Sequence, residues 1–563
     1  SGSLQNQNPA TDTDTYNVAV GYNAGNAVTT GSQNTLIGGL AGDALTTPAN
    51  NVAVGYNTLT ADTKGSASVA IGVSALAAQN FTTATDVYNT AVGANAGASV
   101  TTGFQNTYIG GLAGDAATAS VENVAVGYQA LSADTLGSKN VAVGRMALLS
   151  QNFTTAHDAY NVGVGHNAGQ QITTGTQNTL IGGQAGDALT ATDYNTAVGY
   201  GALSSDTLGA RNTAVGQEAL GSQNFTTATT SYNTAVGMQA GRLVTTGIYN
   251  TIVGGLACDA LTDADYNVAI GYAALTSDTL GSRSTAIGYN ALTFQNFTTA
   301  TDSYNTAVGF DAGQRVSTAI YNTLIGGLAG DALTVGNSNV AVGFNALTTD
   351  TQGDRNVAVG AGSLRDQNFT TTTDSYNVAV GYEAGLLVTT GVHNTLIGGL
   401  AGDAITTGTQ NIIIGYVATA SAVDAANQTV IGAGVTSVGN GNFTFGSGTS
   451  DSNIANGATT ITAPSDERYK EDITDSTAGL SFINDLRPVT YKWKKEKDIP
   501  TTQKAYVEGS EKRVMNDRTN HGFIAQEVKA AIDNHPELKD GFDMWMEDEA
   551  DGRQRLGPSA LIP

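Results

Sequence analysis

Hydrophobic and polar residues recur along this chain in a five-residue core, first seen as Asn17-Val-Ala-Val-Gly21. Equivalent cores return after steps of 17, 17, 17 and 21 residues, so the whole pattern repeats every 72 residues. There are 24 cores between residues 17 and 432, and all of them end in Gly. Asn opens 21 of them, and Ser68, Ser284 and Gln428 open the others. A fixed period of this kind indicates a repeat architecture.

The alternation inside each core predicts a β-strand. If the core is numbered 0 to 4, positions 1 and 3 are β-branched or Thr and share one face, whereas position 2 is usually Ala or Leu and takes the other. We predict that position 3 lines the interior and that the opposite face can pack on a neighbouring chain. The final Gly predicts a sharp turn that requires a positive φ or leaves no room for a Cβ. The repeated Asn predicts ladders of stacked amides.

These elements predict a mostly β fold, a β-roll or β-solenoid rod of 17-residue coils over residues 17–432. Coils stacked at strand spacing would make a rod of about 115 Å. Each coil is too small to bury a core unaided, so we expect three chains side by side. Residues 1–16 form a polar lead-in. Residues 433–464 lose the 17-residue step and predict a β neck with short strands near 439–446 and 454–461.

Every fourth coil is longer and carries the segment Gln79-Asn-Phe-Thr-Thr, which ends at Tyr88. The same segment begins again at Gln151, Gln223, Gln295 and Gln367, and the matching tyrosines are Tyr160, Tyr232, Tyr304 and Tyr376. One interpretation is that these aromatic bulges cover the coil edge or a seam between chains. The other is a regularly spaced array of ligand contacts.

Composition separates a second domain from the rod. The formal net charge is -24, yet only 37 of the first 464 residues are charged, against 35 of the last 99. This change marks a boundary near Pro464. An acidic surface argues against nucleic-acid binding, which needs basic patches. We see no apolar run long enough to span a bilayer and no secretory signal.

The rod offers no strong candidate for catalysis or metal binding. Columns of Asp repeat with the coils, as at Asp43 and at Asp62, Asp134 and Asp206, and suit solvated turns. They do not have EF-hand spacing. Cys258 occupies a position that is Gly in the other superrepeats, and we interpret it as a neutral substitution at a site for small residues. We therefore assign no cofactor and no metal site, and calcium held by the Asp turns stays open as an alternative.

Residues 465–563 have a different character, with helices predicted near 477–485 and 524–533. Three motifs stand out. They are Ser465-Asp-Glu-Arg-Tyr-Lys470, Arg487-Pro-Val-Thr-Tyr-Lys-Trp493 and His521-Gly-Phe-Ile-Ala-Gln-Glu-Val528.

This combination resembles the endosialidase-type intramolecular chaperone of phage tailspikes and tail fibres, a self-cleaving domain classed as a peptidase. The resemblance covers nearly all of the last 99 residues. It implies an α+β domain that trimerises, sets the register of three fibre strands and then cuts itself off at Ser465. The family's Ser-Lys dyad maps onto Ser465 and Lys470, where a desolvated Lys can serve as the base for a Ser nucleophile. Asp466 and Arg468 would shape the site, and His521 would be a packing or hydrogen-bonding residue.

The repeats of residues 16–432 resemble the head β-rolls of trimeric autotransporter adhesins and of some phage fibres. The sequence thus predicts a homotrimeric phage fibre that is located on the virion, extracellular, and attached to tail or baseplate proteins. It would bind a host surface receptor, with a glycan as one option. Single-turnover autoproteolysis would be its only enzymatic activity. We expect the chain to be processed or truncated at its ends. It stops where the endosialidase-type chaperones usually begin a long C-terminal helix.

Two alternatives remain. A bacterial trimeric adhesin is compatible with the repeats, although nothing after them resembles its membrane anchor. A polysaccharide-degrading tailspike would require a pair of carboxylates in a cleft, and no single coil stands out as such a site.

Overall fold

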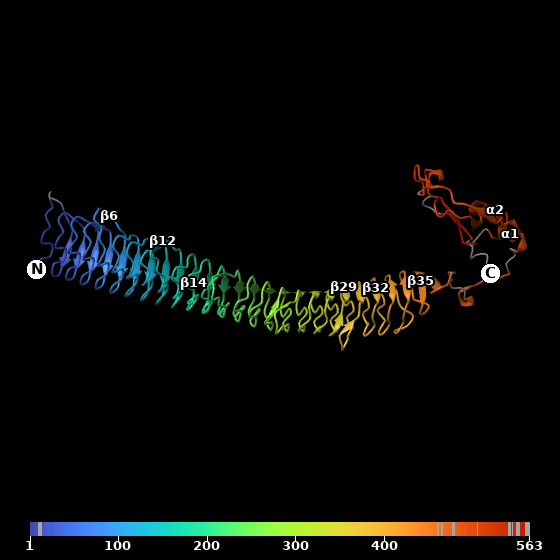
Figure 1. Cartoon of the computed structure of the whole chain (residues 1–563), viewed down its shortest axis with the longest axis horizontal. Coiled ribbons are helices and arrows are strands. Elements are labelled where there is room, and N and C mark those ends of the chain that lie inside the picture. The colour runs from blue at the N-terminus through green and yellow to red at the C-terminus, as the bar shows by residue number, and fades with distance from the viewer. Residues whose placement is uncertain are drawn as a thin grey trace. The chain divides into compact units, whose positions relative to one another are not determined.

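The computed structural model describes residues 1–9, 14–458, 461–462, 466–475, 479–503, 505–538, 542, 544–547 and 552–557. The chain divides into two compact units, residues 1–464 and 465–563, and each is described here by itself. In the first unit, coils stack one after another along its whole length (Figure 1).

Each Asn-led core forms a three-residue strand that ends before the invariant Gly, as the alternation predicts. The 24 strands are β1 (Val18–Val20), β2 (Thr35–Ile37), β3 (Val52–Val54), β5 (Val69–Ile71), β7 (Thr90–Val92), β8 (Thr107–Ile109), β9 (Val124–Val126), β11 (Val141–Val143), β13 (Val162–Val164), β14 (Thr179–Ile181), β15 (Thr196–Val198), β17 (Thr213–Val215), β19 (Thr234–Val236), β20 (Thr251–Val253), β21 (Val268–Ile270), β23 (Thr285–Ile287), β25 (Thr306–Val308), β26 (Thr323–Ile325), β27 (Val340–Val342), β29 (Val357–Val359), β31 (Val378–Val380), β32 (Thr395–Ile397), β33 (Ile412–Ile414) and β34 (Thr429–Ile431).

These strands pair in parallel, each with the next along the chain. Val18 lies opposite Thr35, and Val20 opposite Ile37, so the register advances by one 17-residue step. With β35 (Asn442–Ser447) and β36 (Ser450–Ala455) they complete a 26-stranded sheet. The predicted mostly β solenoid of 17-residue coils is confirmed.

The long fourth coils add short parallel pairs outside this sheet. They are β4 (Gly65–Ser66) with β6 (Thr85–Asp86), β10 (Gly137–Ser138) with β12 (His157–Asp158), β16 (Gly209–Ala210) with β18 (Thr229–Thr230), β22 (Gly281–Ser282) with β24 (Thr301–Asp302), and β28 (Gly353–Asp354) with β30 (Thr373–Asp374).

The interior of the coils is lined by position 2, not by position 3 as the sequence had led us to predict. Leu36, Ala53 and Ala70 are fully buried, while Ile37 and Ile71 are each 38% exposed. The interior is narrow and is filled mainly by Ala and Leu, which come from position 2 and from the turns. Both faces of the strand are apolar, so hydrophobicity alone could not tell inside from outside.

The invariant Gly satisfies both conditions that its conservation along the repeat predicts. Its φ lies between +127° and +143° in all coils. A Cβ on Gly182 would also stand 2.4 Å from the carbonyl oxygen of Gly199 in the next coil. No L-residue fits this turn without moving the backbone.

The Asn column forms a ladder, with a different main bond from the predicted one. Asn178 Nδ2 donates to the Thr192 carbonyl oxygen in its own coil at 2.8 Å. Its Oδ1 accepts the backbone N–H of Asn195 in the next coil at 2.9 Å. Amide-to-amide bonds, such as Asn178 Nδ2 to Asn161 Oδ1 at 3.2 Å, occur in only some of the coils. The side chain therefore replaces missing backbone partners at a turn that is otherwise buried.

The two ends of the rod are covered by chain segments of their own. At the N-terminal end, the backbone N–H of Leu4 donates to the Ala24 carbonyl oxygen at 3.0 Å, and Leu4 packs on the core. At the other end β35 continues the parallel sheet, and β36 turns back antiparallel to it. The neck was predicted to have its second strand at 454–461, and the structure has it at Ser450–Ala455.

The second unit combines short helices and strands. Its elements are η1 (Glu467–Tyr469), α1 (Leu480–Asp485), β37 (Val489–Tyr491), η2 (Glu496–Asp498), β38 (Asn520–Gly522), α2 (Ala525–Asp533), η3 (Pro536–Leu538), β39 (Trp545–Glu547) and β40 (Gln554–Leu556). β37 pairs with β38, and β39 with β40, both antiparallel. Its core is formed by Phe482, Leu486, Val528, Ala531, Ile532, Leu538 and Met544.

Candidate functional sites

The predicted dyad lies at the start of the second unit. Ser465 falls outside the described residues, so the structure gives no distance between it and Lys470. Asp466 caps η1, because its Oδ1 accepts the backbone N–H of Arg468 at 2.9 Å. Lys470 follows as the C-cap, and its N–H donates to the Glu467 carbonyl oxygen at 3.0 Å. Four residues, which include the 3-10 turn η1, therefore lie between the two members of the dyad.

Asp466 and Arg468 form a forked ion pair within this turn. Arg468 Nε lies 3.0 Å from Asp466 Oδ1, and Arg468 Nη2 lies 2.6 Å from Asp466 Oδ2. The guanidinium lowers the pKa of the Asp466 carboxyl below its usual value. These residues bind one another, which agrees with a role in shaping the segment.

Lys470 is exposed in the single chain. A lysine becomes a base near neutral pH when burial or a neighbouring cation lowers its pKa. If Lys470 is such a base, its burial has to come from a surface that covers η1.

The second and third motifs meet in the fold. Arg487 precedes β37, Glu527 lies in the first turn of α2, and Arg487 Nε donates to Glu527 Oε2 at 2.9 Å. The backbone of His521 pairs with Thr490, which places β37 beside β38. The second and third motifs are therefore neighbours in the fold.

Two histidines of this unit have different environments. The His535 side chain lies between Asp485 Oδ2 at 2.9 Å and Glu537 Oε1 at 3.0 Å, and its hydrogen bond to Asp485 is the largest cause of its raised pKa. His521, predicted to be a packing or hydrogen-bonding residue, is exposed. It borders an open hollow of about 490 Å³ with Val489 and Phe523 among the other lining residues.

A buried polar network in each long coil is the main feature that sequence reasoning missed. Asp134 is 1% exposed, and its Oδ1 accepts the backbone N–H groups of Gly137 at 3.0 Å and Phe153 at 3.1 Å. Its Oδ2 accepts from Gln151 Nε2 at 2.6 Å, and Gln151 Oε1 accepts from Asn161 Nδ2 at 2.8 Å.

The same network occurs in all five long coils. The other sets are Asp62, Gln79 and Asn89; Asp206, Gln223 and Asn233; Asp278, Gln295 and Asn305; and Asp350, Gln367 and Asn377. The prediction that this Asp column occupies solvated turns was wrong, because the extra length of the fourth coil folds over it. The spacing of 17 residues between Asp and Gln was the signal that could have revealed the contact.

Three of the exposed tyrosines that end the long coils, Tyr232, Tyr304 and Tyr376, belong to stacks of rings. The ring of Tyr249 stacks on Tyr232 and Tyr266, with centroids 5.7 Å and 5.2 Å apart. The Arg211 guanidinium lies 4.5 Å from the Tyr194 centroid and 5.8 Å from that of Tyr232. The faces of these stacked rings are therefore at least partly covered by neighbours in the same chain. This arrangement favours a structural role over stacking on a ligand.

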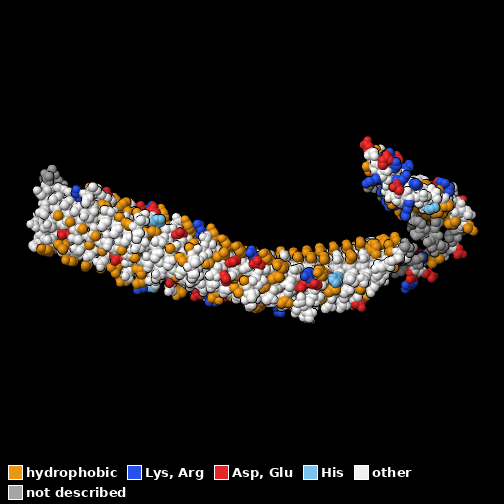
Figure 2. Space-filling view, in the orientation of Figure 1, with side chains coloured by type: hydrophobic (Ala, Val, Ile, Leu, Met, Phe, Trp, Pro, Cys, Tyr) orange, Lys and Arg blue, Asp and Glu red, His pale blue; other side chains and the backbone are white. Residues whose placement is uncertain are grey.

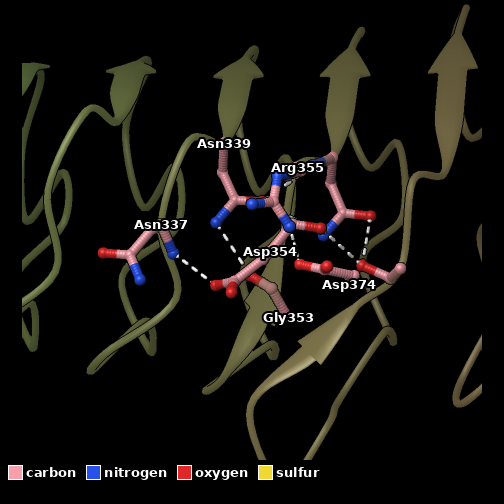
Figure 3. A network of polar contacts seen from close by, with 8 residues as sticks. Asn337, Asn339, Gly353, Asp354, Arg355 and Asp374 are labelled. Atoms are coloured by element: carbon pink, nitrogen blue, oxygen red, sulfur yellow. Dashed lines mark hydrogen bonds and ion pairs between the residues drawn. The ribbon is translucent and has the colours of Figure 1, made fainter.

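Beside the stacked rings, polar contacts fasten the long coil to its neighbours (Figure 3). Asp354 is 7% exposed and accepts the backbone N–H of Asn337 at 2.6 Å. Arg355 forms an ion pair with Asp374 of β30 and lies over the Tyr376 ring, 5.5 Å from its centroid. Equivalent ion pairs join Lys139 to Asp158 and Arg283 to Asp302.

Among the described residues no three His, Cys, Asp or Glu side chains gather as a possible metal site. None of the helices described is both long enough and apolar enough to cross a membrane.

Residues 465–536 match the Peptidase S74 family, described as the chaperone of endosialidase. The match begins at the boundary between the two units and includes all three motifs, but it ends before the last 27 residues that the sequence resemblance had included. No curated protein and no solved structure matches the chain. The chain thus joins a β-solenoid rod to a C-terminal domain of the endosialidase-chaperone type.

Proposed function

We propose that this chain is the subunit of a homotrimeric phage fibre, a virion appendage that attaches to the host surface. The observation that supports this best is the position of the chaperone-type match, which begins where the 24-coil rod and its neck end. Its partners would be two further copies of itself, tail or baseplate proteins of the virion, and a receptor on the host. No observation specifically supports a bacterial adhesin. A polysaccharide-degrading tailspike gains no support either, because the five buried Asp residues accept hydrogen bonds on both carboxylate oxygens, unlike the carboxylates of a hydrolase cleft.

The C-terminal domain would trimerise first and set the register of the rods. Nearly identical coils can pair with many offsets, and a domain that fixes one end removes that ambiguity. Expression of the full chain should then give more correctly assembled trimer than expression of a chain ending at Pro464. Equal yields of the same trimer from both would contradict the chaperone role.

The domain would then release itself by one cut at Ser465. Lys470 would take the Ser465 hydroxyl proton as Oγ attacks the carbonyl carbon of Pro464, and the Ser465 nitrogen would leave with a proton. Water would hydrolyse the resulting ester, which gives a carboxylate on Pro464 and a free amino group on Ser465. Because Lys470 is exposed in the single chain, we infer that assembly supplies the burial this step requires.

Intact mass under denaturing conditions tests the cleavage. The parent chain should yield two fragments split at Ser465, whereas Ser465→Ala and Lys470→Ala should each yield one full-length chain. Lys492→Ala, which changes another exposed lysine of the same unit, should still be cut. One full-length chain in all four samples would mean that the domain stays on the fibre as a cap.

A further inference from the structure

The outward face of the long sheet is free of charge from end to end. Positions 1 and 3 of the 24 strands provide 48 outward side chains, and every one is Val, Ile or Thr. Position 3 remains well exposed, as shown by Ile181 at 38% and Ile325 at 39%. Figure 2 shows such a row of hydrophobic side chains along the strands in the second half of the rod.

Position 5, just after the invariant Gly, adds a third column to this face. In the second coil of each superrepeat this residue is Gly, and in the third coil of each superrepeat it is aromatic. A Cβ on Gly39 would lie 3.3 Å from Cδ2 of Tyr56, so the ring rests against the Gly of the coil before it. The ring still exposes 59% of its surface. The aromatic residues of the third coils are Tyr56, Tyr128, Tyr200, Tyr272, Phe344 and Tyr416, and four other coils carry Tyr22, Tyr289, Phe310 and Tyr382 at the same position.

The size of this face is that of a protein interface. A three-residue strand is about 10 Å long, and 24 strands stacked at about 4.8 Å give a strip on the order of 1,000 Å². A stable interface buries about 800 Å² on each partner, and the largest exposed patch of a typical monomer is about 300–600 Å². A partner that covered the strip would have to be as long, as regular and as free of charge.

We propose that this strip, defined by positions 1, 3 and 5 of the coils, packs against the same strip of two further copies, parallel and in register. The inference rests on the proposed fibre and names the surface that joins its chains. A second copy is the partner whose length, coil spacing and scarcity of charge match those of the strip. Position 5 is polar in three coils, at Arg145, His166 and Gln217, and Arg145 Nη1 lies 3.1 Å from His166 Nε2.

The aromatic and Gly positions would also restrict the register. If three copies are level, aromatic rings from the same coil meet at one height and the small residues meet at another. A shift by one, two or three coils would oppose rings to the wrong coils, and only a shift by four coils, about 19 Å, would restore the pattern. The strip would therefore reject short slips and leave the four-coil slip to be excluded by other means.

Cysteine cross-linking of the full chain tests this surface. The background is Cys258→Gly, which removes the buried thiol and restores the residue found at this position in the other five superrepeats. Ile325→Cys places a thiol on the strip, and Thr299→Cys places one on an exposed bulge of a long coil as the control. Each protein is treated with a short bismaleimide, and covalent dimers are measured under denaturing conditions, with native mass measured in parallel.

The strip variant should give on the order of tenfold more covalent dimer than the control, because thiols held at one level meet at a high effective concentration. A four-coil slip would place position 325 beside Val253 or Ile397, about 19 Å from its own counterpart and beyond a short linker. Absence of the dimer in a protein of trimeric native mass would overturn the inference and leave the fibre proposal standing. A monomeric native mass of the parent chain would overturn both.

Discussion

The invariant Gly illustrates how one residue is fixed by two separate constraints. Gly182 combines a φ of +134° with a distance of 2.4 Å from a would-be Cβ to the Gly199 carbonyl oxygen. We expect Gly182→Ala to destabilise its coils by about 3 kcal/mol, since the strain and the clash add. The measurement is amide hydrogen exchange around residue 182 in the full chain.

The adjacent Gly183 provides a matched control. Its Cβ would lie 3.4 Å from Cδ2 of Tyr200, which is an ordinary contact, and Ala occupies the same position at Ala94 and Ala361. Gly183→Ala should leave the exchange of these coils nearly unchanged. Equal effects of the two substitutions would show that the backbone conformation at Gly182 is not what fixes the residue.

The glutamine of the long coil is fixed by polarity rather than by shape. Gln223 donates to Asp206 Oδ2 at 2.6 Å and accepts from Asn233 Nδ2 at 2.8 Å, and all three side chains are buried. Gln223→Glu keeps the size of the side chain but sets two carboxyl groups against each other. We expect a loss of roughly 3 kcal/mol at neutral pH, measured by the same exchange experiment. Gln105→Glu at an exposed position should cost little, and a similar loss there would point to net charge as the cause.

At the scale of elements, the long fourth coil makes the rod sensitive to pH. Burial raises the pKa of Asp134 and Asp206, although hydrogen bonds from glutamines and backbone amides oppose the shift. A raised pKa means that the folded state binds the proton more tightly than the unfolded state. The stabilisation is complete below the unfolded pKa of about 4 and is lost as pH rises through the folded value.

The test compares thermal midpoints of the parent chain with those of Asp134→Asn plus Asp206→Asn between pH 4 and pH 7. The parent should lose stability over this range more steeply than the double variant, which cannot ionise at these sites. A pair of substitutions at exposed positions, Asp86→Asn with Asp424→Asn, serves as the control for net charge. Parallel curves for the parent and the double variant would contradict the assigned cause.

The elements themselves were largely predictable, because the repeat shows the same strand and turn 24 times. The sequence did not reveal which face is buried, since Val20 and Ala19 are both apolar and the buried position varies in size from Ala53 to Tyr108. It also left the Asp134 network unseen, because its contacts depend on how the long coil folds back. For the candidate site, the motif named Ser465 and Lys470, and their pairing stays a prediction because Ser465 lies outside the described residues and Lys470 is exposed in the single chain.

At the scale of the whole molecule, the 72-residue superrepeat is the unit that can be removed without a mismatch. Deleting residues 233–304 joins Tyr232 to Asn305, which repeats the native junction of Tyr232 with Asn233. We expect this variant to assemble with an unchanged thermal midpoint and a rod about 19 Å shorter, measured by electron microscopy.

Deleting the single coil 250–266 should be less well tolerated. It removes Gly255, so the ring of Tyr272 would rest on the coil that carries Met238 instead. We expect a lower midpoint for this deletion than for the longer one. The opposite order would show that rod length matters more than the aromatic pattern.

The same period decides what the C-terminal domain has to do. A slip by four coils restores the pattern on the strip, so side-chain complementarity does not distinguish it from the level arrangement. Its only cost is that the coils at the ends lose their partners. A domain that joins three chains at residue 465 would exclude such a slip directly.

Chains ending at Pro464, expressed with Cys258→Gly and Ile325→Cys, should therefore form assemblies with mixed offsets and give less cross-linked dimer than the full chain. Native mass identifies the trimers, and only these are compared. Equal cross-linking in both would mean that the rod finds its own register and that the domain serves another step of assembly.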